Sequence, residues 1–296
     1  MKTKTGYHNF VGYMFISPFL IGLFIFTIFP VLMSLYLSFT RYDLLSAPEW
    51  AGFGNYTRML TEDAKFWQAM KVTFYYVISA VPFRLVVALL IALLLARVTK
   101  ASGLYRTFLY LPSIIGGSVA VAVMWKQLFG NQGAVNGILG LLGLKSLSWL
   151  GPDLAIWTLI LLYGWQFGSS MLIFLAGLKN IPVTYYEAAN VDGAGAMYRF
   201  VKITLPLLSP VILFNVVMQI INGFMAFTPS FIITKGGPMN STLLYVLYMF
   251  QRAFSFFEMG YASAMAWILL AIIAFFTAIV FLSSRYWVHY ESGGDR

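Results

Sequence analysis

Residues 72–96 read VTFYYVISAVPFRLVVALLIALLLA and contain a single charged side chain, Arg84. A helix of about 20 apolar residues crosses a bilayer core of about 30 Å, so this stretch predicts a transmembrane helix. Five further apolar stretches of similar length occur at 13–39, 107–129, 153–178, 207–228 and 262–284. The sequence therefore predicts an all-α, polytopic membrane protein with six transmembrane helices.

The composition agrees with this fold class. Of the 296 residues, 60% are hydrophobic and 10% are charged, whereas soluble domains carry about 25% charged residues. The segments between the predicted spans are short, and we expect residues 1–296 to form a single transmembrane domain. The chain contains no cysteine, which excludes disulfides, thiolate metal sites and a cysteine nucleophile.

The positive charges indicate an orientation. With a cytoplasmic N-terminus, the inside segments 1–12, 97–106, 179–206 and 285–296 hold 10 Lys and Arg in 62 residues, and the outside segments hold 7 in 88. Basic residues are enriched on the cytoplasmic side of membrane proteins, so we expect both termini inside. The net charge of +9 includes no basic run, so the sequence gives no sign of nucleic-acid binding.

Enzyme chemistry is poorly represented. The two histidines, His8 and His289, lie near the ends, and no spacing of acids and histidines indicates a metal site. The acidic pair Glu62–Asp63 falls in the outer loop 40–71, where we expect a solvated surface. No Gly-Lys dipeptide occurs, so the chain lacks a P-loop and cannot hold nucleotide phosphates in that way.

The largest inside loop, 179–206, predicts a helix–turn–helix. Asn180 is a candidate N-cap with Pro182 in the first turn. Asp192-Gly193-Ala194-Gly195 breaks the helix, which can resume from Met197 to Ile203. Leu205-Pro206 is expected to end this second helix and to open the fifth span.

Polar residues inside the spans are costly in lipid and are informative for that reason. In the fifth span, Asn215, Gln219 and Asn222 follow a spacing of i, i+4 and i+7, which places them on one helix face, and Ala226 extends the row. Such carboxamides suit a neutral, hydroxyl-rich ligand because they donate and accept hydrogen bonds. They are equally suited to hydrogen bonds between helices, and both interpretations remain open.

Two more polar features lie in the second and fourth spans. Gln166, Ser169 and Ser170 form a cluster in the fourth span, and the aromatic Trp165 lies next to it. Arg84 lies midway along the second span, which contains no acid. It needs a partner or a water-lined position, and it would be the first residue to examine for an anionic ligand.

One pattern identifies a family. Glu187-Ala188-Ala189 is followed by three residues, Gly193, nine residues, Ile203, one residue and Leu205-Pro206. This resembles, without a gap, the signature (EAA) loop of membrane subunits of binding-protein-dependent ABC importers. Ser17-Pro18-Phe19, Gly236-Gly237-Pro238 and Met259-Gly260-Tyr261-Ala262 are similar to its carbohydrate branch, in particular to the maltose-type first permease subunit.

The resemblance implies a type I importer permease in the cytoplasmic (inner) membrane of a bacterium or archaeon. Its expected partners are a second homologous permease subunit, two ATPase subunits, an extracytoplasmic solute-binding protein, the sugar substrate and membrane lipid. No cofactor is expected on this chain, and ATP and Mg would bind the ATPases. The signature loop would dock on an ATPase through Glu187, Ala188, Ala189, Asp192 and Gly193.

The resemblance also implies substrate contacts in spans four and five. Carried over by an ungapped offset, these fall on Gln166, Ser169, Gln219, Asn222, Gly223 and Ala226. Gly223 and Ala226 are small where the maltose-type subunit is polar, which indicates a different sugar or a weaker contact. The competing hypothesis is a self-contained secondary transporter for a polar solute. That class typically has carboxylates within the spans and an inverted repeat, but here Asp153, at the edge of a span, is the one acid in the six predicted spans, and no repeat is visible.

Overall fold

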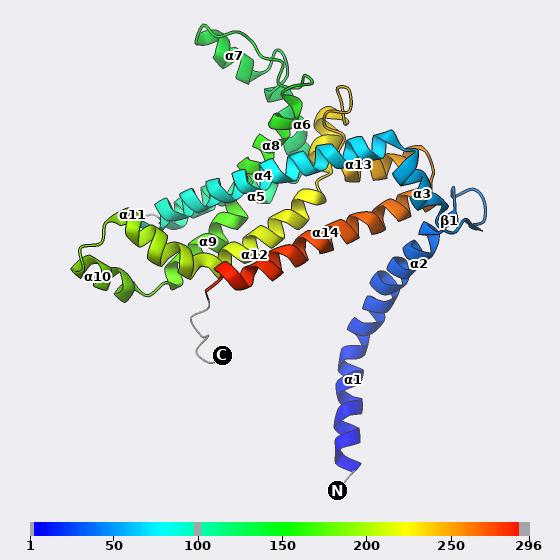
Figure 1. Ribbon diagram of the computed structural model, residues 1–296, viewed down its shortest axis with the longest axis horizontal. Coiled ribbons are helices and arrows are strands. Elements are labelled where there is room, and N and C mark those ends of the chain that lie inside the picture. The colour runs from blue at the N-terminus through cyan, green and yellow to red at the C-terminus, as the bar shows by residue number, and fades with distance from the viewer. Residues whose placement is uncertain (1–2, 98–101, 290–296) are drawn as a thin grey trace. The chain divides into compact units, whose positions relative to one another are not determined.

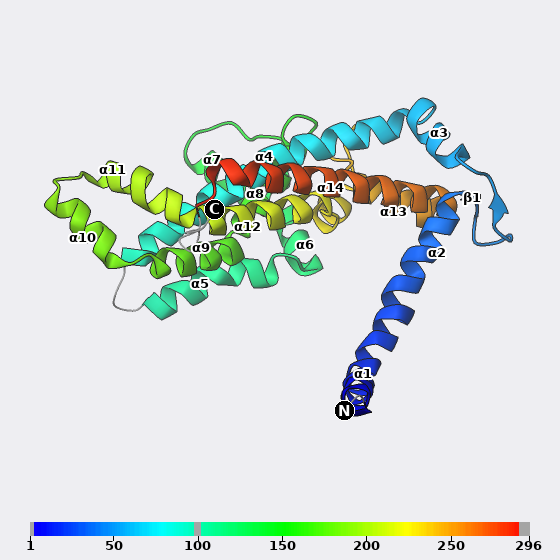
Figure 2. The same ribbon diagram turned by 60° about the horizontal axis from the view of Figure 1, so that its bottom comes forward.

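The structure is a computed structural model, and it describes residues 3–97 and 102–289. Parts of the expected inside segments, namely 1–2, 98–101 and 290–296, lie outside the described residues. The described chain is almost entirely helical and forms two compact units (Figures 1 and 2). Unit 1 comprises Met1–Asp63 with Met249–Leu270, and unit 2 comprises Ala64–Tyr248 with Ala271–Arg296.

Unit 1 starts with one long helical segment. It runs through α1 (Thr3–Leu23), the π-helical turn η1 (Phe24–Ile28) and α2 (Phe29–Ser38). The wider π turn directly precedes Pro30, which has no N–H to donate, and the helix continues through the proline. The short antiparallel strands β1 (Thr40–Arg41) and β2 (Glu49–Trp50) follow, and then α3 (Gly54–Thr61).

The rest of unit 1 comes from the C-terminal third of the chain. It contains the end of α13 (Tyr245–Phe250), the π turn η4 (Gln251–Ser255) and the beginning of α14 (Met259–Trp287). Gly260 makes the close packing in this unit possible, because a Cβ there would lie 2.1 Å from the carbonyl oxygen of Thr40. The Gly260 amide donates to the carbonyl of Tyr42 at 3.1 Å.

One sequence prediction fails in unit 1. Asp63 was expected on a solvated surface, but its side chain is buried and accepts hydrogen bonds from Arg252 at 2.9 Å and from the Tyr261 hydroxyl at 2.6 Å. Arg252 also pairs with Glu258 at 2.9 Å. These partners lie about 190 residues downstream, so no local pattern could have revealed them.

Unit 2 is organised around α4 (Ala64–Arg97), which packs against α8 (Ala155–Trp165), α9 (Gly168–Asn180) and α12 (Leu205–Phe224) (Figure 1). A core of small and large apolar side chains joins these helices: Ala88, Ala92, Leu95, Met171, Phe174, Leu175 and Leu208. The alanines of α4 let the neighbouring helices approach closely, and small residues at helix contacts are typical of membrane bundles.

The shorter elements of unit 2 complete its description. They are α5 (Ser102–Ile115), α6 (Val119–Leu128), α7 (Ala134–Leu141), α10 (Val183–Val191), α11 (Ala196–Arg199), η2 (Phe200–Thr204) and η3 (Ser230–Thr234). The glycine-rich segment 130–152 forms only the short α7, in keeping with the low helix propensity of glycine.

Within the described residues, four helical segments have the length and apolarity of a membrane span: Gly12–Ser38, Ala64–Ala96, Ala196–Phe224 and Met259–Trp287. The other two predicted spans are bent pairs rather than straight helices. α5 and α6 meet at 97°, and α8 and α9 meet at 42°. Counting each bent pair as one membrane span gives six spans in the described residues.

The bend between α5 and α6 has a local cause. Gly116 and Gly117 interrupt the helix, and Ser118 caps α6 by accepting a hydrogen bond from the amide of Val121 at 3.3 Å. A Cβ at Gly116 would lie 2.4 Å from Cγ of Gln166. Glycine at position 116 therefore allows the bend between α5 and α6 to lie close to the bend between α8 and α9.

The loop 179–206 forms the predicted helix–turn–helix with two differences. Asn180 is the last residue of α9, and Pro182 occupies the N-cap position of α10, so Asn180 is not the cap. Leu205-Pro206 does not end a helix, because α11, η2 and α12 form one continuous helical segment. The π turn η2 directly precedes Pro206 and accommodates its missing N–H, as η1 does for Pro30.

Candidate functional site

The first candidate site is the hairpin formed by α10 and α11, residues 183–199, which lies at one end of unit 2 (Figure 2). Gly193 ends α10 with φ of +75°, a left-handed conformation that favours glycine. Its amide donates to the carbonyl of Asn190 at 3.1 Å, and the Ala194 amide donates to that of Ala189 at 2.9 Å. This pair of bonds is a Schellman motif, which fixes the turn between the two helices.

The expected docking residues are accessible on this hairpin. Glu187, Ala188, Asp192 and Gly193 are exposed, and Ala189 is half-buried. No atom lies within 4 Å of a Cβ built on Gly193. These residues are therefore accessible to another protein, and their role in docking stays a prediction.

Large apolar side chains surround the docking residues. Val183, Val191, Met197 and Tyr198 are exposed, and Val191 has 89% of its surface accessible. Exposed apolar side chains beside small and acidic residues are typical of a protein–protein interface. The sequence patterns did not single out these residues.

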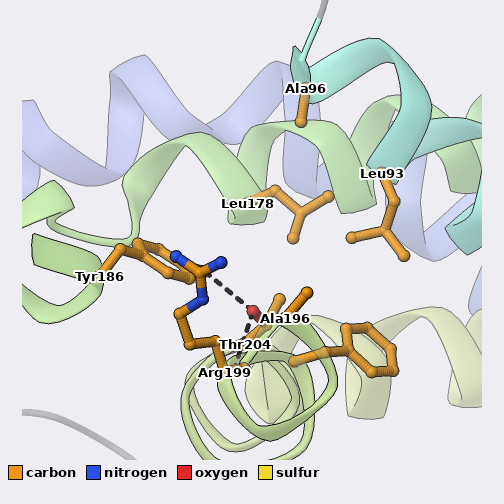
Figure 3. Close-up of a pocket in the computed structure, with 8 residues that line it drawn as sticks. Leu93, Ala96, Leu178, Tyr186, Ala196, Arg199 and Thr204 are labelled. Atoms are coloured by element: carbon orange, nitrogen blue, oxygen red, sulfur yellow. Dashed lines mark hydrogen bonds between the residues drawn. The ribbon is translucent and has the colours of Figure 1, made fainter. Parts of the chain in front are cut away.

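One side-chain hydrogen bond connects the hairpin to the helical segment that follows, and another joins the two helices of the hairpin. The Tyr186 hydroxyl lies 2.9 Å from Oγ1 of Thr204 (Figure 3). Arg199 donates to Oδ1 of Asn190. Tyr186, Arg199 and Thr204 line an open pocket of about 620 Å³, together with Leu93, Leu178 and Phe200. Through Thr204, α10 is attached to the base of the helical segment that contains α12.

The second candidate site is a group of polar side chains inside unit 2, and its geometry begins at the bend between α8 and α9. Ser113 donates to the carbonyl of Gln166 at 2.8 Å and accepts from the amide of Ser169 at 3.0 Å. The Gln166 side chain donates to the carbonyl of Gly116 at 2.9 Å. These bonds satisfy backbone groups freed by the bends, as a broken membrane helix requires.

A buried group of polar side chains, which we call the polar cluster, adjoins this bend and consists of Tyr76, Arg84, Tyr163, Ser169 and Gln219. Arg84 Nη2 lies 3.2 Å from Oγ of Ser169, and its guanidinium lies 4.6 Å from the centroid of the Tyr163 ring. The Tyr163 hydroxyl donates to Oε1 of Gln219 at 2.9 Å. The polar cluster thus joins α4, α8, α9 and α12.

The remaining expected pathway residues do not form one continuous surface. Asn222 is exposed, whereas Asn215 is fully buried and donates to the carbonyl of Val211 in its own helix. Gly223 is buried against α4, where a Cβ would lie 3.3 Å from side chains of Val77 and Val81. Ala226 lies beyond the last residue of α12, so it does not extend the helical row as expected.

The sequence patterns did not reveal Tyr76, Ser113 and Tyr163, which supply hydroxyl groups at the centre of this site. A signal was present, because all three lie inside predicted spans, where a hydroxyl needs a partner. Tyrosine is also common at membrane interfaces, and for that reason its position alone did not single it out.

Comparison with known proteins identifies the class. Residues 64–288 match the family described as binding-protein-dependent transport system inner membrane component. The chain belongs to this family, and the resemblance seen in the signature loop is confirmed. It is a multi-pass membrane permease subunit of an ABC importer.

Curated relatives match over nearly the whole length. A probable ABC transporter permease protein, YesP of Bacillus subtilis, is 59% identical, covering 96% of this chain and 93% of its own. The lactose transport system permease protein LacF of Rhizobium radiobacter is 32% identical, covering 94% and 95%. The arabinooligosaccharides transport system permease protein AraP of Bacillus subtilis is 32% identical, covering 88% and 84%.

Solved structures show the same fold. A chain of a bacterial ABC transporter involved in the import of the acidic polysaccharide alginate superimposes with a TM-score of 0.83 at 21% identity, covering 95% of this chain and 97% of that chain. A bacterial alginate ABC transporter in complex with an alginate pentasaccharide-bound periplasmic protein gives 0.82 at 20% identity, covering 95% and 96%. The type I importer permease fold predicted for this chain is confirmed.

Proposed function

We propose that this permease imports a sugar or oligosaccharide, using ATP hydrolysed by separate ATPase subunits. The named functions of its relatives support a carbohydrate: lactose in one case and arabinooligosaccharides in another. The observation that carries the ATP-driven mechanism is the exposed hairpin 183–199 with the signature Glu187-Ala188-Ala189 and Gly193. Without a P-loop, the chain needs other subunits to bind ATP and Mg.

The proposed assembly contains a second homologous permease, two ATPases and an extracytoplasmic solute-binding protein. The similar alginate transporter forms a complex with a pentasaccharide-bound periplasmic protein, which supports the last of these partners. The exposed carboxylate of Glu187 would pair with a basic group on the ATPase, and the small Ala188 and Gly193 would permit close contact. The neighbouring apolar surface at Val183 and Val191 would add burial energy.

Force would reach the substrate pathway through α12. Displacement of α10 by the ATPase moves Thr204 through the Tyr186 hydrogen bond and the hairpin turn. Gln219 lies 15 residues further along the same continuous helix, about 22 Å at 1.5 Å per residue. A rigid helix of this length converts a movement at its base into a tilt at the polar cluster.

The proposed substrate pathway includes Gln166, Ser169, Gln219, Asn222, Gly223 and Ala226. The exposed Asn222 is the strongest member for direct contact, because its carboxamide is free to hydrogen-bond with sugar hydroxyls. Gln166, Ser169 and Gln219 already make hydrogen bonds within the subunit. They would position the pathway and exchange partners when the helices tilt.

Affinity purification from the native membrane tests the assembly. The tagged chain is extracted in mild detergent, its partners are identified by mass spectrometry, and ATP hydrolysis of the eluate is measured. We expect an ATPase and a second permease to co-purify. If the chain alone moves solute in liposomes without an ATPase, the secondary-transporter hypothesis replaces the importer.

A substitution in the proposed docking surface, compared with a control substitution elsewhere, tests the assignment of that surface. Glu187→Lys should reduce the amount of co-purified ATPase, whereas Lys145→Glu, in the segment between α7 and α8, should leave it unchanged. Equal ATPase recovery from wild type and Glu187→Lys would contradict the assigned docking surface.

A further inference from the structure

The polar cluster contains a cation that has no counterion among the described residues. Arg84 lies in the middle of α4 and is 7% exposed. None of α4, α8, α9 and α12 contains an Asp or Glu. Burial of an unpaired charge is strongly unfavourable, and a protein retains such a group when an anion or a polar pathway compensates it.

The contacts of Arg84 within the subunit are neutral. They include the Ser169 hydroxyl at 3.2 Å and the face of the Tyr163 ring at 4.6 Å. Among the described residues, the buried Nε of Arg84 has no hydrogen-bond partner, and neither does the buried hydroxyl of Tyr76. The rings of Tyr76 and Tyr163 lie 5.8 Å apart, so this second unsatisfied group belongs to the same cluster.

These groups can all donate to an anion. An arginine presents five N–H donors in a plane that matches a carboxylate, and charge-assisted bonds of this type are roughly twice as strong as neutral ones. The cluster also contains Ser169 and Gln219, which belong to the proposed pathway. An anion bound by Arg84 would therefore lie beside the hydroxyl and carboxamide groups that a sugar needs.

We propose that Arg84 and the hydroxyl of Tyr76 bind the carboxylate of a uronate residue as the oligosaccharide passes through the permease, which makes the substrate an acidic oligosaccharide. This assignment rests on the proposed function as a sugar importer. The neutral part of the oligosaccharide contacts Asn222, and binding of the carboxylate fixes the position of the oligosaccharide along the pathway. A site built for an anion discriminates against the neutral analogue, because its buried cation is then left unpaired.

The first test identifies the substrate class in the native host. Cells with and without this gene receive a mixture of uronate-containing and neutral oligosaccharides of matched length, and depletion of each from the medium is followed by mass spectrometry. We expect the gene-dependent uptake to be confined to uronate-containing oligosaccharides. Gene-dependent uptake of neutral oligosaccharides alone would overturn the proposal. If neither class is taken up in a gene-dependent way, the proposal and the proposed function as a sugar importer are both overturned.

The second test assigns the carboxylate to Arg84. Uptake of the acidic oligosaccharide is compared with that of the same compound after chemical reduction of its carboxyl group, in wild type, Arg84→Gln and Arg84→Lys. Arg84→Gln should lower uptake of the acid about 10- to 100-fold and should remove the preference for the acid over its reduced form. Arg84→Lys, which keeps the charge, should restore part of that preference.

The purified complex supplies the control for folding. Its yield and its elution volume on size-exclusion chromatography should be the same for wild type and Arg84→Gln. If Arg84→Gln lowers uptake of the acid and the reduced compound by the same factor, Arg84 has a structural role or pairs with a carboxylate of the second permease, and the proposal is overturned.

Discussion

The hydroxyl of Tyr186 and Oγ1 of Thr204 lie 2.9 Å apart, which connects α10 to the base of the helical segment that contains α12. Thr204 Oγ1 also contacts the carbonyl of Arg199 at 3.4 Å, and Thr204 is buried. The bond lies beside the pocket shown in Figure 3.

Removal of this bond should uncouple ATP hydrolysis from transport. We expect Tyr186→Phe to lower the number of solute molecules moved per ATP, with a loss of stability of about 0.5–1.5 kcal/mol, the usual net value of one hydrogen bond. The measurement is uptake and ATP hydrolysis by the reconstituted complex. Thr204→Val should have the same effect, and an unchanged transport ratio in both variants would exclude the bond from coupling.

Two glycines of the hairpin provide a matched comparison. Gly193 has φ of +75° and Gly195 has φ of −69°, and no atom lies within 4 Å of a Cβ at either. Gly193→Ala should therefore cost about 1–2 kcal/mol from the left-handed backbone alone, and it should weaken ATPase binding. Gly195→Ala should have little effect on either. ATPase affinity and thermal unfolding of the two variants check this, and identical values would show that the turn tolerates a side chain.

Substitutions of the carboxamides Gln219 and Asn222 should differ in their effect on stability. Gln219→Ala removes the Oε1 acceptor of the buried Tyr163 hydroxyl, which keeps the backbone carbonyl of residue 219 at 3.0 Å. We therefore expect a loss of about 0.5–1.5 kcal/mol in stability in addition to reduced uptake. Asn222 is exposed, and Asn222→Ala should reduce uptake with the melting temperature unchanged. Wild-type uptake by Asn222→Ala would remove this residue from the substrate pathway.

The ion pairs of unit 1 should differ in importance according to burial. The Asp63 side chain is 5% exposed and that of Arg58 is 41% exposed. Asp63→Asn should lower the free energy of unfolding by about 1–3 kcal/mol, because the buried bonds from Arg252 and Tyr261 lose a charged acceptor. Arg58→Gln should cost about 0–1 kcal/mol, the range for exposed pairs. Thermal unfolding in detergent measures both, and the opposite order would contradict the burial argument.

The orientation can be tested directly, because the chain contains no cysteine. Leu45 and Tyr286 are highly exposed and lie in segments expected outside and inside, respectively. A membrane-impermeant maleimide should label Leu45→Cys in intact cells and should label Tyr286→Cys only after permeabilisation. Labelling in the reverse order would invert the topology.

Local sequence patterns predicted much of this structure. Apolar runs located the span-forming segments, since the bilayer sets their length whatever the neighbours are. The turn at Asp192–Gly195 was also predictable, because glycine at the end of a helix is a local signal. The prediction failed at Pro206, where a π turn in the preceding residues keeps the helix continuous, and sequence spacing does not reveal such a turn.

The candidate site was predictable only in part. Ser169 and Gln219 were singled out because burying a polar side chain in lipid is unfavourable. This argument can be made without knowing which residues the side chains contact. Their partners Arg84 and Tyr163 lie 85 and 56 residues away, respectively, in the sequence. The pairing depends on which helices pack together.

By itself, the sequence determined the membrane location and the family, because hydropathy and a contiguous motif are properties of neighbouring residues. The tertiary structure decided that Asp63 is buried in an ion-pair network, that Gly116 must leave space for Gln166, and that Arg84 packs against helices that carry no acid. Burial and hydrogen bonding depend on residues brought together from distant parts of the chain, and the free energy of an ionised or polar side chain depends on those neighbours.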